Sequence, residues 1–170
     1  MFLQETGEEM KRKPKGFTLI ELVVVITILA ILAAVALPKF VALQADARLA
    51  KMNGALASIK AAAAMAHAQF IARGFSTNQT IPQASSTIVV EGTTVGFVNG
   101  YPAAGQIAAI AGISPPDYVF ASAGPSTLTI APDANHDGIG INPACTVVYT
   151  EAQANQQPSY VINATLGTCQ

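Results

Sequence analysis

A long apolar run near the amino terminus, from Phe17 to Leu37, is the feature that most restricts what this chain can form. A helix over this run rises roughly 31 Å at about 1.5 Å per residue, and the hydrocarbon core of a bilayer is about 30 Å thick. The sequence therefore predicts a membrane-spanning helix. Its one charged residue is Glu21. A carboxylate in such a segment costs about 2.5–3.5 kcal/mol on insertion scales, so Glu21 is either incidental or paired with a cation, and we favour the second interpretation.

The residues just before this run, from Lys11 to Lys15, are strongly basic. A basic flank keeps its end of a membrane helix in the cytoplasm, so we expect a single-pass precursor in the inner membrane with the rest of the chain outside the cytoplasm. An ordinary cleaved secretory signal is the alternative, since Ala33 to Ala36 imitates a cleavage site. Such a signal has a shorter apolar region, of about 7–15 residues.

The segment Gly16-Phe17-Thr18-Leu19-Ile20-Glu21, after its basic leader, resembles the type IV pilins and the pseudopilins of type II secretion. The resemblance implies that a prepilin peptidase cuts after Gly16 and methylates the new amino terminus at Phe17. It also implies that Glu21 pairs with this amine during assembly, and that the chain works with a pilus or secretion assembly platform.

Phe17 and Glu21 lie about one helical turn apart. Glu21 of one subunit can therefore meet Phe17 of a neighbour only if the two helices are staggered along their axes. A staggered head-to-tail contact that does not close produces a helical filament, so the expected partner is a second copy of the same chain.

We expect four segments: a cleaved leader at 1–16, the membrane and assembly helix at 17–38, an amphipathic helix at 39–74, and a β-sheet region with a carboxy-terminal disulfide loop at 75–170. The first nine residues contain Glu but no Lys or Arg, which favours translation from Met10. Pro38 removes a backbone donor and is expected to kink the helix. Gly74 is expected to end it.

The helical stretch after Pro38 carries one apolar stripe at three- and four-residue steps, which predicts packing on a sheet. The stripe is Leu49, Met52, Leu56, Ile59, Ala63, Ala66 and Phe70. The alternative is an amphipathic helix lying on the membrane. Beyond it, the composition changes to strand and turn residues. The expected strands are 87–91, 94–98, 118–121, 127–131, 146–151 and 160–165, with a short helix at 103–111 and a hairpin loop at 152–159. The predicted fold class is α+β, with a long helix on an antiparallel sheet.

Cys145 and Cys169 flank the last expected hairpin, whose centre near 155–157 brings positions close to 145 and 168 opposite each other. We expect them to form a disulfide, with a two-ligand metal site and a pair of reduced thiols as alternatives. A carboxy-terminal disulfide loop is similar to that of the pilins, whereas major pseudopilins usually lack one. The segments around Arg48, Gly100 and Cys145 further resemble the mannose-sensitive haemagglutinin pilins.

The segment after Gly74 contains Asp and Glu but no Lys or Arg, since Arg73 is the last basic residue of these two types. Direct binding of nucleic acid by this region is therefore not expected, since such binding depends on Lys and Arg contacts to phosphate. The basic helix residues Lys39, Arg48, Lys51 and Lys60 are expected to meet acidic surfaces of neighbouring subunits.

Asp133, Asn135 and Asp137 stand at alternate positions before Gly138, as in an oxygen-rich calcium loop. Ala144 occupies the place where an EF-hand has its last glutamate, so the pattern indicates either a different calcium site or an ordinary turn. No other cofactor is expected. We find no nucleophile elbow, phosphate-binding loop or zinc signature, so an enzyme is not expected.

The resemblance predicts a structural subunit of a type IV pilus, exported through the inner membrane and assembled into surface fibres for adhesion, attachment or motility. Two alternatives remain at this point. The chain could be a major pseudopilin of a type II secretion system, or a membrane-anchored binding domain that does not polymerise.

Overall fold

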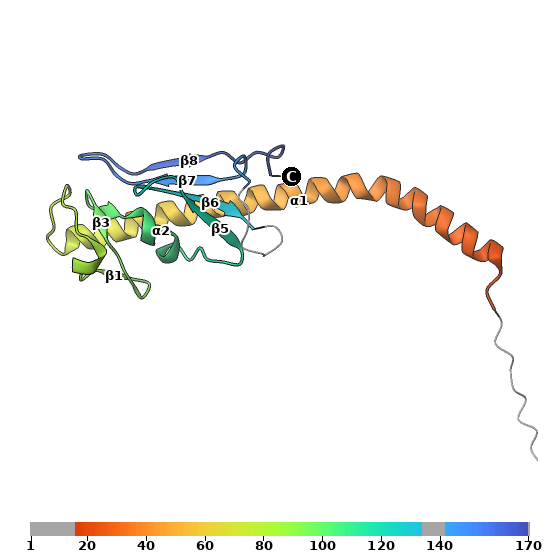
Figure 1. Cartoon of the computed structure of the whole chain (residues 1–170), viewed down its shortest axis with the longest axis horizontal. Coiled ribbons are helices and arrows are strands. Elements are labelled where there is room, and N and C mark those ends of the chain that lie inside the picture. Colours follow the sequence, from red (N-terminus) through yellow and green to blue (C-terminus); the bar gives the residue numbers. More distant parts are fainter. Residues whose placement is uncertain (1–15, 134–141, 170) are drawn as a thin grey trace, which may run out of the picture. The chain divides into compact units, whose positions relative to one another are not determined.

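The structure, a computed structural model, describes residues 16–133 and 142–169. The chain divides into two compact units, Met1–Lys39 and Phe40–Gln170. Helix α1 (Leu19–Ala72) contributes its first part to one unit and its second part to the other. We call the second unit the head; it also contains every strand of the described residues (Figure 1).

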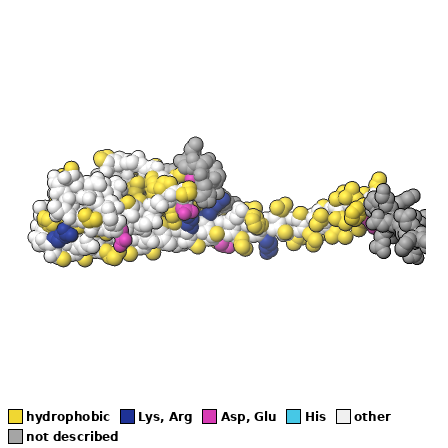
Figure 2. Space-filling view, turned by 90° about the horizontal axis from the view of Figure 1, so that it is seen from below, with side chains coloured by type: hydrophobic (Ala, Val, Ile, Leu, Met, Phe, Trp, Pro, Cys, Tyr) yellow, Lys and Arg dark blue, Asp and Glu magenta, His cyan; other side chains and the backbone are white. Residues whose placement is uncertain are grey.

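The described part of the first unit presents apolar side chains on all sides. An 18-residue window of α1 has a mean hydropathy of 2.9, and none of it is buried. Hydrophobic side chains cover the face of this segment shown in Figure 2. By length and composition, this part of the helix is able to cross a membrane, as the sequence predicts. Pro38 lies inside α1, which is helical on both sides of it; the kink remains a prediction.

The end of α1 is a Schellman motif centred on Gly74. Gly74 has a φ of 81°, which costs glycine no steric strain. Its N–H donates to the carbonyl of Ile71 at 2.8 Å, and the N–H of Phe75 donates to the carbonyl of Phe70 at 3.4 Å. The Phe70 and Phe75 rings, with centroids 5.0 Å apart, supply the apolar contact typical of this cap. The predicted end of the helix at Gly74 is confirmed.

The head is built on a four-stranded antiparallel sheet whose strands follow one another in chain order. Its strands are β5 (Tyr118–Ser122), β6 (Thr127–Pro132), β7 (Val147–Thr150) and β8 (Ser159–Ile162). Two small hairpins and two short helices precede it. They are the 3₁₀ turn η1 (Gln83–Ser85), β1 (Val89–Val90) with β2 (Thr93–Thr94), β3 (Phe97–Val98) with β4 (Tyr101–Pro102), and α2 (Ala104–Ile110). The α+β class predicted from the sequence is confirmed.

The two small hairpins correct the prediction of a single strand at 94–98. Thr94 belongs to β2 and Phe97 begins β3, so the segment is divided between two separate hairpins. Gly96 lies between them, where a Cβ atom would approach the backbone nitrogen of Gln83 to 2.8 Å. This close passage of another chain segment interrupts the strand.

The core of the head lies between the second half of α1 and the strands. Buried positions of α1 recur at helical spacing and include Met52, Ile59, Ala63, Ala66 and Phe70, which confirms the predicted stripe and its packing on the strands. Leu49 and Leu56 are only partly buried.

The Phe70 ring packs against the Phe97 ring of β3, with centroids 4.7 Å apart. Ile130 and Val147 of the sheet are fully buried in the same cluster. Fully burying an aromatic or aliphatic side chain of this size stabilises a fold by about 1.5–3 kcal/mol.

Two buried polar contacts join β7 and its end to the region around α2. The hydroxyl of Tyr149 donates to the carbonyl of Pro102 at 2.6 Å. The carboxylate of Glu151, next to β7, accepts from the backbone N–H of Ala104 at 2.7 Å, where α2 begins. A carboxylate is favourable at this end of a helix because the backbone N–H groups there lack partners.

Candidate functional site

The predicted cleavage point lies on exposed chain directly before α1. Gly16, Phe17 and Thr18 have no regular secondary structure, and Phe17 is 94% exposed. A Cβ atom built on Gly16 meets nothing within 4 Å. Exposed, irregular backbone of this kind is what a peptidase can bind, so the geometry is compatible with the predicted cut between Gly16 and Phe17.

Thr18 and Glu21 form a capping box at the start of α1. The N–H of Thr18 donates to Oε2 of Glu21 at 2.8 Å, and the N–H of Glu21 donates to Oγ1 of Thr18 at 3.3 Å. The Thr18 hydroxyl also donates to Oε2 of Glu21 at 2.7 Å. The prediction for Glu21 concerned its charge alone; the pattern Thr-x-x-Glu before an apolar run is the signal that indicates this second role.

The capping box leaves half of the carboxylate available. The recorded bonds of Glu21 all fall on Oε2, so among the described residues Oε1 has no partner. A residue that caps its own helix can therefore still accept a hydrogen bond or an ion pair from outside. The role of Glu21 and Phe17 in assembly remains a prediction.

The two cysteines are joined in the head. Cys145 and Cys169 form a disulfide with their Cα atoms 5.0 Å apart, and both residues are about 1% exposed. The disulfide expected from the sequence is present. Arg48 of α1 donates to the carbonyl of Cys169 at 3.3 Å, which holds the end of the described chain against the helix.

The register that brings the cysteines together differs from the predicted one. Strand β7 pairs Val147 with Ile162, and beyond the strands the N–H of Asn163 donates to the carbonyl of Thr146 at 2.8 Å. Direct continuation would therefore place residue 164, and not 168, opposite Cys145. Cys169 reaches its partner because the chain turns after Thr165, where Thr168 and Cys169 donate to the Thr165 carbonyl.

Two of the basic α1 residues expected to meet neighbouring subunits have partners inside the chain. Lys51 donates to the Asp117 carbonyl at 2.6 Å and lies 3.4 Å from the carboxylate of the same residue. Arg48 binds the Cys169 carbonyl, as described above. Both therefore hold the second part of α1 to the rest of the head in the single chain.

The candidate calcium residues lie only partly within the described chain. Asp133 directly follows β6, is 4% exposed, and its N–H donates to the carbonyl of Asp117 at 3.0 Å. Asn135 and Asp137 lie outside the described residues. Among the described residues, no three His, Cys, Asp or Glu side chains form a group that could hold a metal ion.

An exposed Gly-Phe junction directly before an apolar helix, and an α+β head, are the features that the resemblance to the pilins led us to expect. The family model described as the prokaryotic N-terminal methylation motif matches residues 11–37, which include Gly16, Phe17 and Glu21. The chain therefore carries the prokaryotic N-terminal methylation motif.

The chain is also similar to the type IV narrow pilus major component PilA5 of Thermus thermophilus. The two are 41% identical over 78 residues, which cover 44% of this chain and 66% of the relative, just under two thirds of its length. No solved structure matches the chain.

Proposed function

We propose that this chain is a structural subunit of a type IV pilus, which polymerises through α1 after removal of its leader. The observation that carries the proposal is the methylation motif at the start of an apolar helix that the rest of the described chain leaves exposed. The similarity to a major pilus component in Thermus thermophilus supports it.

Cleavage after Gly16 gives Phe17 a cationic amine. This amine lies next to Thr18, whose backbone N–H donates to the Glu21 carboxylate. The capping box fixes the carboxylate at the end of the helix and leaves Oε1 for a partner outside the chain. In a membrane or a filament core of low dielectric constant, an amine and a carboxylate attract each other far more strongly than in water. Pairing between staggered copies offsets the cost of burying Glu21 and adds subunits without closing a ring.

The proposal includes the location and the partners of the chain. The precursor is anchored in the inner membrane with its head outside the cytoplasm, a prepilin peptidase removes the leader, and an assembly platform adds the subunit to a surface fibre. The fibre serves adhesion, attachment or motility.

The disulfide supports a pilus over a secretion pseudopilus. A bridge between Cys145 and Cys169 suits a domain exposed to an oxidising exterior. A carboxy-terminal disulfide loop is similar to that of the pilins, whereas the major pseudopilins usually lack one. A secretion pseudopilin gives short periplasmic fibres under normal expression, and an anchored binding domain gives no fibres.

The test is the composition of sheared surface fibres. We expect electron microscopy to show long fibres, and amino-terminal sequencing with mass analysis to show a subunit that begins at methylated Phe17. Fibres made of another protein, or a chain that keeps its basic leader in the membrane, would overturn the proposal.

A further inference from the structure

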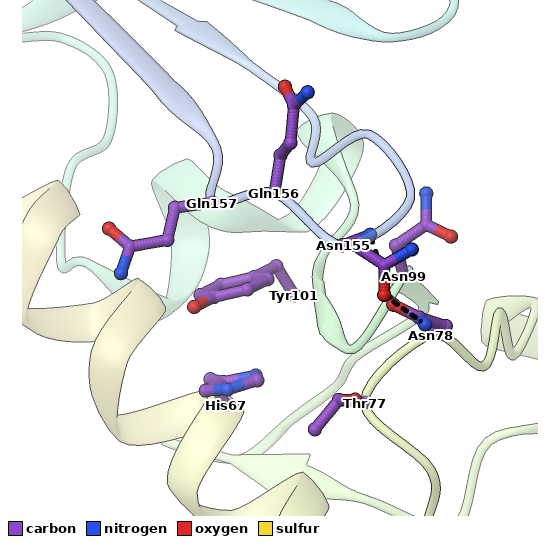
Figure 3. Close-up of a pocket in the computed structure, with 8 residues that line it drawn as sticks. All are labelled: His67, Thr77, Asn78, Asn99, Tyr101, Asn155, Gln156 and Gln157. Atoms are coloured by element: carbon purple, nitrogen blue, oxygen red, sulfur yellow. Dashed lines mark hydrogen bonds between the residues drawn. The ribbon is translucent and has the colours of Figure 1, made fainter.

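Two neighbouring cavities in the head share His67, Tyr101 and Gln157. The first, of about 260 Å³, is lined mainly by amide side chains, and we call it the amide cavity (Figure 3). The second, of about 480 Å³, is lined in part by Lys60 and Tyr160, and we call it the lysine cavity. Since three residues line both cavities, the two lie next to each other, and we call them together the hollow.

A stacked pair of rings forms part of the wall of both cavities. The rings of His67 of α1 and Tyr101 of β4 are stacked, with an angle of 2° between their planes and with centroids 4.0 Å apart. A ring nitrogen of His67, Nδ1, is 2.8 Å from the carbonyl of Gly100. The β3–β4 turn is in close contact with another chain segment, because a Cβ atom on Gly100 would lie 2.5 Å from the Thr77 carbonyl oxygen. These contacts hold the wall in one geometry before any ligand arrives.

The amide cavity offers hydrogen-bonding groups of both kinds. Five of its eight lining residues are Asn or Gln: Asn78, Asn99, Asn155, Gln156 and Gln157. Asn78 and Asn155 bond each other through two contacts, at 2.6 and 3.1 Å, and Asn99 donates to the Ala152 carbonyl.

Part of this capacity is not used within the described chain. Within the described residues, neither the Gln157 side-chain amide nor the Tyr101 hydroxyl makes a hydrogen bond. Figure 3 shows both side chains reaching toward the same side of the hollow. An amide and a hydroxyl placed side by side donate and accept, and they match a ligand rich in hydroxyl groups.

The lysine cavity adds one positive charge to this neutral polar surface. The ammonium group of Lys60 lies 5.6 Å from the centroid of the Tyr160 ring and has no carboxylate partner among the described residues. Among the described residues, no Asp or Glu lines either cavity. The charge that Lys60 of α1 brings to the hollow is positive, whereas the segment after Gly74 contains Asp and Glu but no Lys or Arg.

We propose that this hollow binds a saccharide that carries a carboxylate. The sugar hydroxyls bind in the amide cavity, the carboxylate pairs with Lys60, and the Tyr160 ring packs against the C–H face of the sugar. A single lysine suits one carboxylate, whereas a nucleic acid strand requires several cations along its phosphates. Binding by a single chain does not require polymerisation, so this proposal can fail or succeed independently of fibre formation.

The test uses the full chain in non-ionic detergent micelles and two acidic probes, trigalacturonate and a hyaluronan tetrasaccharide. Fully methyl-esterified trigalacturonate is the neutral control. Titrations are followed by calorimetry and by the NMR signals of the Asn and Gln side-chain amides. We expect saturable binding of at least one acid, with shifts at Gln157 and Asn99, and weaker binding of the ester by on the order of tenfold.

Three variants test whether the charge of Lys60 itself, and not a general loss of positive charge, is needed for binding. Lys60→Met keeps the length of the side chain and removes its charge, so it should weaken binding of the acid about tenfold and leave binding of the ester unchanged. Lys51→Met makes the same charge change away from the hollow and should bind like the original chain. Gln157→Ala should weaken binding of both the acid and the ester.

Three results would overturn the proposal. They are the absence of saturable binding of both acids at millimolar concentration, equal affinity for acid and ester, or equal weakening by Lys60→Met and Lys51→Met. If neither acid binds and Lys60→Met blocks fibre formation, the hollow is a contact between subunits.

Discussion

Thr18 and Glu21 cap the same helix end reciprocally, each accepting the backbone N–H of the other. The arrangement places the cap residue Thr18 one position after the expected new amino terminus, and α1 begins at Leu19. It also gives Glu21 two physical roles, as a cap and as a charge. Glutamine at this position preserves the capping box and removes the charge, so the two roles can be separated.

We predict that Glu21→Gln and Glu21→Ala both abolish or severely reduce fibres, while both variants still insert into the membrane. The reason is that each removes the charge that we propose pairs with the Phe17 amine, and neither makes the helix less apolar. The measurement is the amount of subunit in the sheared fraction relative to the membrane fraction.

Thr18→Val is the matched control for the cap. It removes the Thr18 hydroxyl and leaves Glu21 charged, so it should weaken the helix start by about 1 kcal/mol and still give fibres. Normal assembly of Glu21→Gln together with loss of fibres in Thr18→Val would show that the cap, and not the charge, is what assembly requires.

The two roles illustrate what the sequence alone could supply. The position of Glu21 and its cost in an apolar helix follow from composition, and so does the membrane span. The capping box was also readable, since Thr18 stands three residues before Glu21. The Phe17 amine, the proposed partner of Glu21, comes from the resemblance and not from the composition, because a contact between copies leaves no periodic pattern within one chain.

We predict that Cys145→Ser lowers the unfolding free energy by about 3–4 kcal/mol, because the bridge closes a loop with a sequence separation of 24 residues. The measurement is urea unfolding of the head signal in micelles, with protease resistance as a second readout. The double variant Cys145→Ala with Cys169→Ala controls for the new hydroxyl and should lose a similar amount. An original chain that unfolds identically with and without reductant would show that the bridge contributes nothing.

The register of the hairpin between Cys145 and Cys169 is a feature that local sequence patterns predict only in part. The two strands were predictable from their β-branched and aromatic residues, and the pairing of the cysteines from their positions on either side. The turn after Thr165, which shifts Cys169 back to Cys145, depends on hydrogen bonds of Thr165 and Thr168 to the backbone and to each other. Such local bonds compete with strand pairing, and the hydrophobic pattern does not report them.

We predict that Gly100→Ala destabilises the head by about 2 kcal/mol or more. Gly100 has a φ of 80°, a region that costs an L-residue about 1–2 kcal/mol, and its new Cβ would lie 2.5 Å from the Thr77 carbonyl oxygen. Gly105→Ala is the control, since a Cβ there meets nothing within 4 Å and the position is helical. It should be neutral or stabilising by up to about 1 kcal/mol. Equal effects of the two substitutions on urea unfolding would contradict this account.

The Asn99-Gly100 dipeptide is a turn signal that the sequence analysis did not use. Asn99 and Gly100 both have left-handed φ values, 50° and 80°, between the two short strands of a hairpin. Asn-Gly is the dipeptide most typical of such a two-residue turn, so β4 was predictable. The hollow beside Tyr101 was not, because its residues come from α1, two loops and a hairpin that meet only in the folded head.

The last prediction concerns alkaline pH and the buried Tyr149. Burial raises the pKa of the Tyr149 hydroxyl well above its usual value of about 10, and burial also raises the pKa of Tyr160 to about 12. In the unfolded chain these groups ionise near pH 10, whereas in the folded head they keep their protons. Their contribution to stability is therefore complete below about pH 10 and is lost progressively as the pH rises toward the folded values.

Tyr149→Phe should lower the unfolding free energy at pH 7 by about 1–3 kcal/mol, because the Pro102 carbonyl loses the hydroxyl that donates to it at 2.6 Å. Above pH 10 the same variant should lose stability less steeply than the original chain, by up to about 1.4 kcal/mol per pH unit, since one linked proton is gone. Tyr160→Phe should reduce the steepness only up to about pH 12. Urea unfolding at pH 8, 10 and 11 measures these slopes. Parallel losses in the original chain and in Tyr149→Phe would mean that the Tyr149 hydroxyl titrates alike in the folded and unfolded states, and that burial does not raise its pKa.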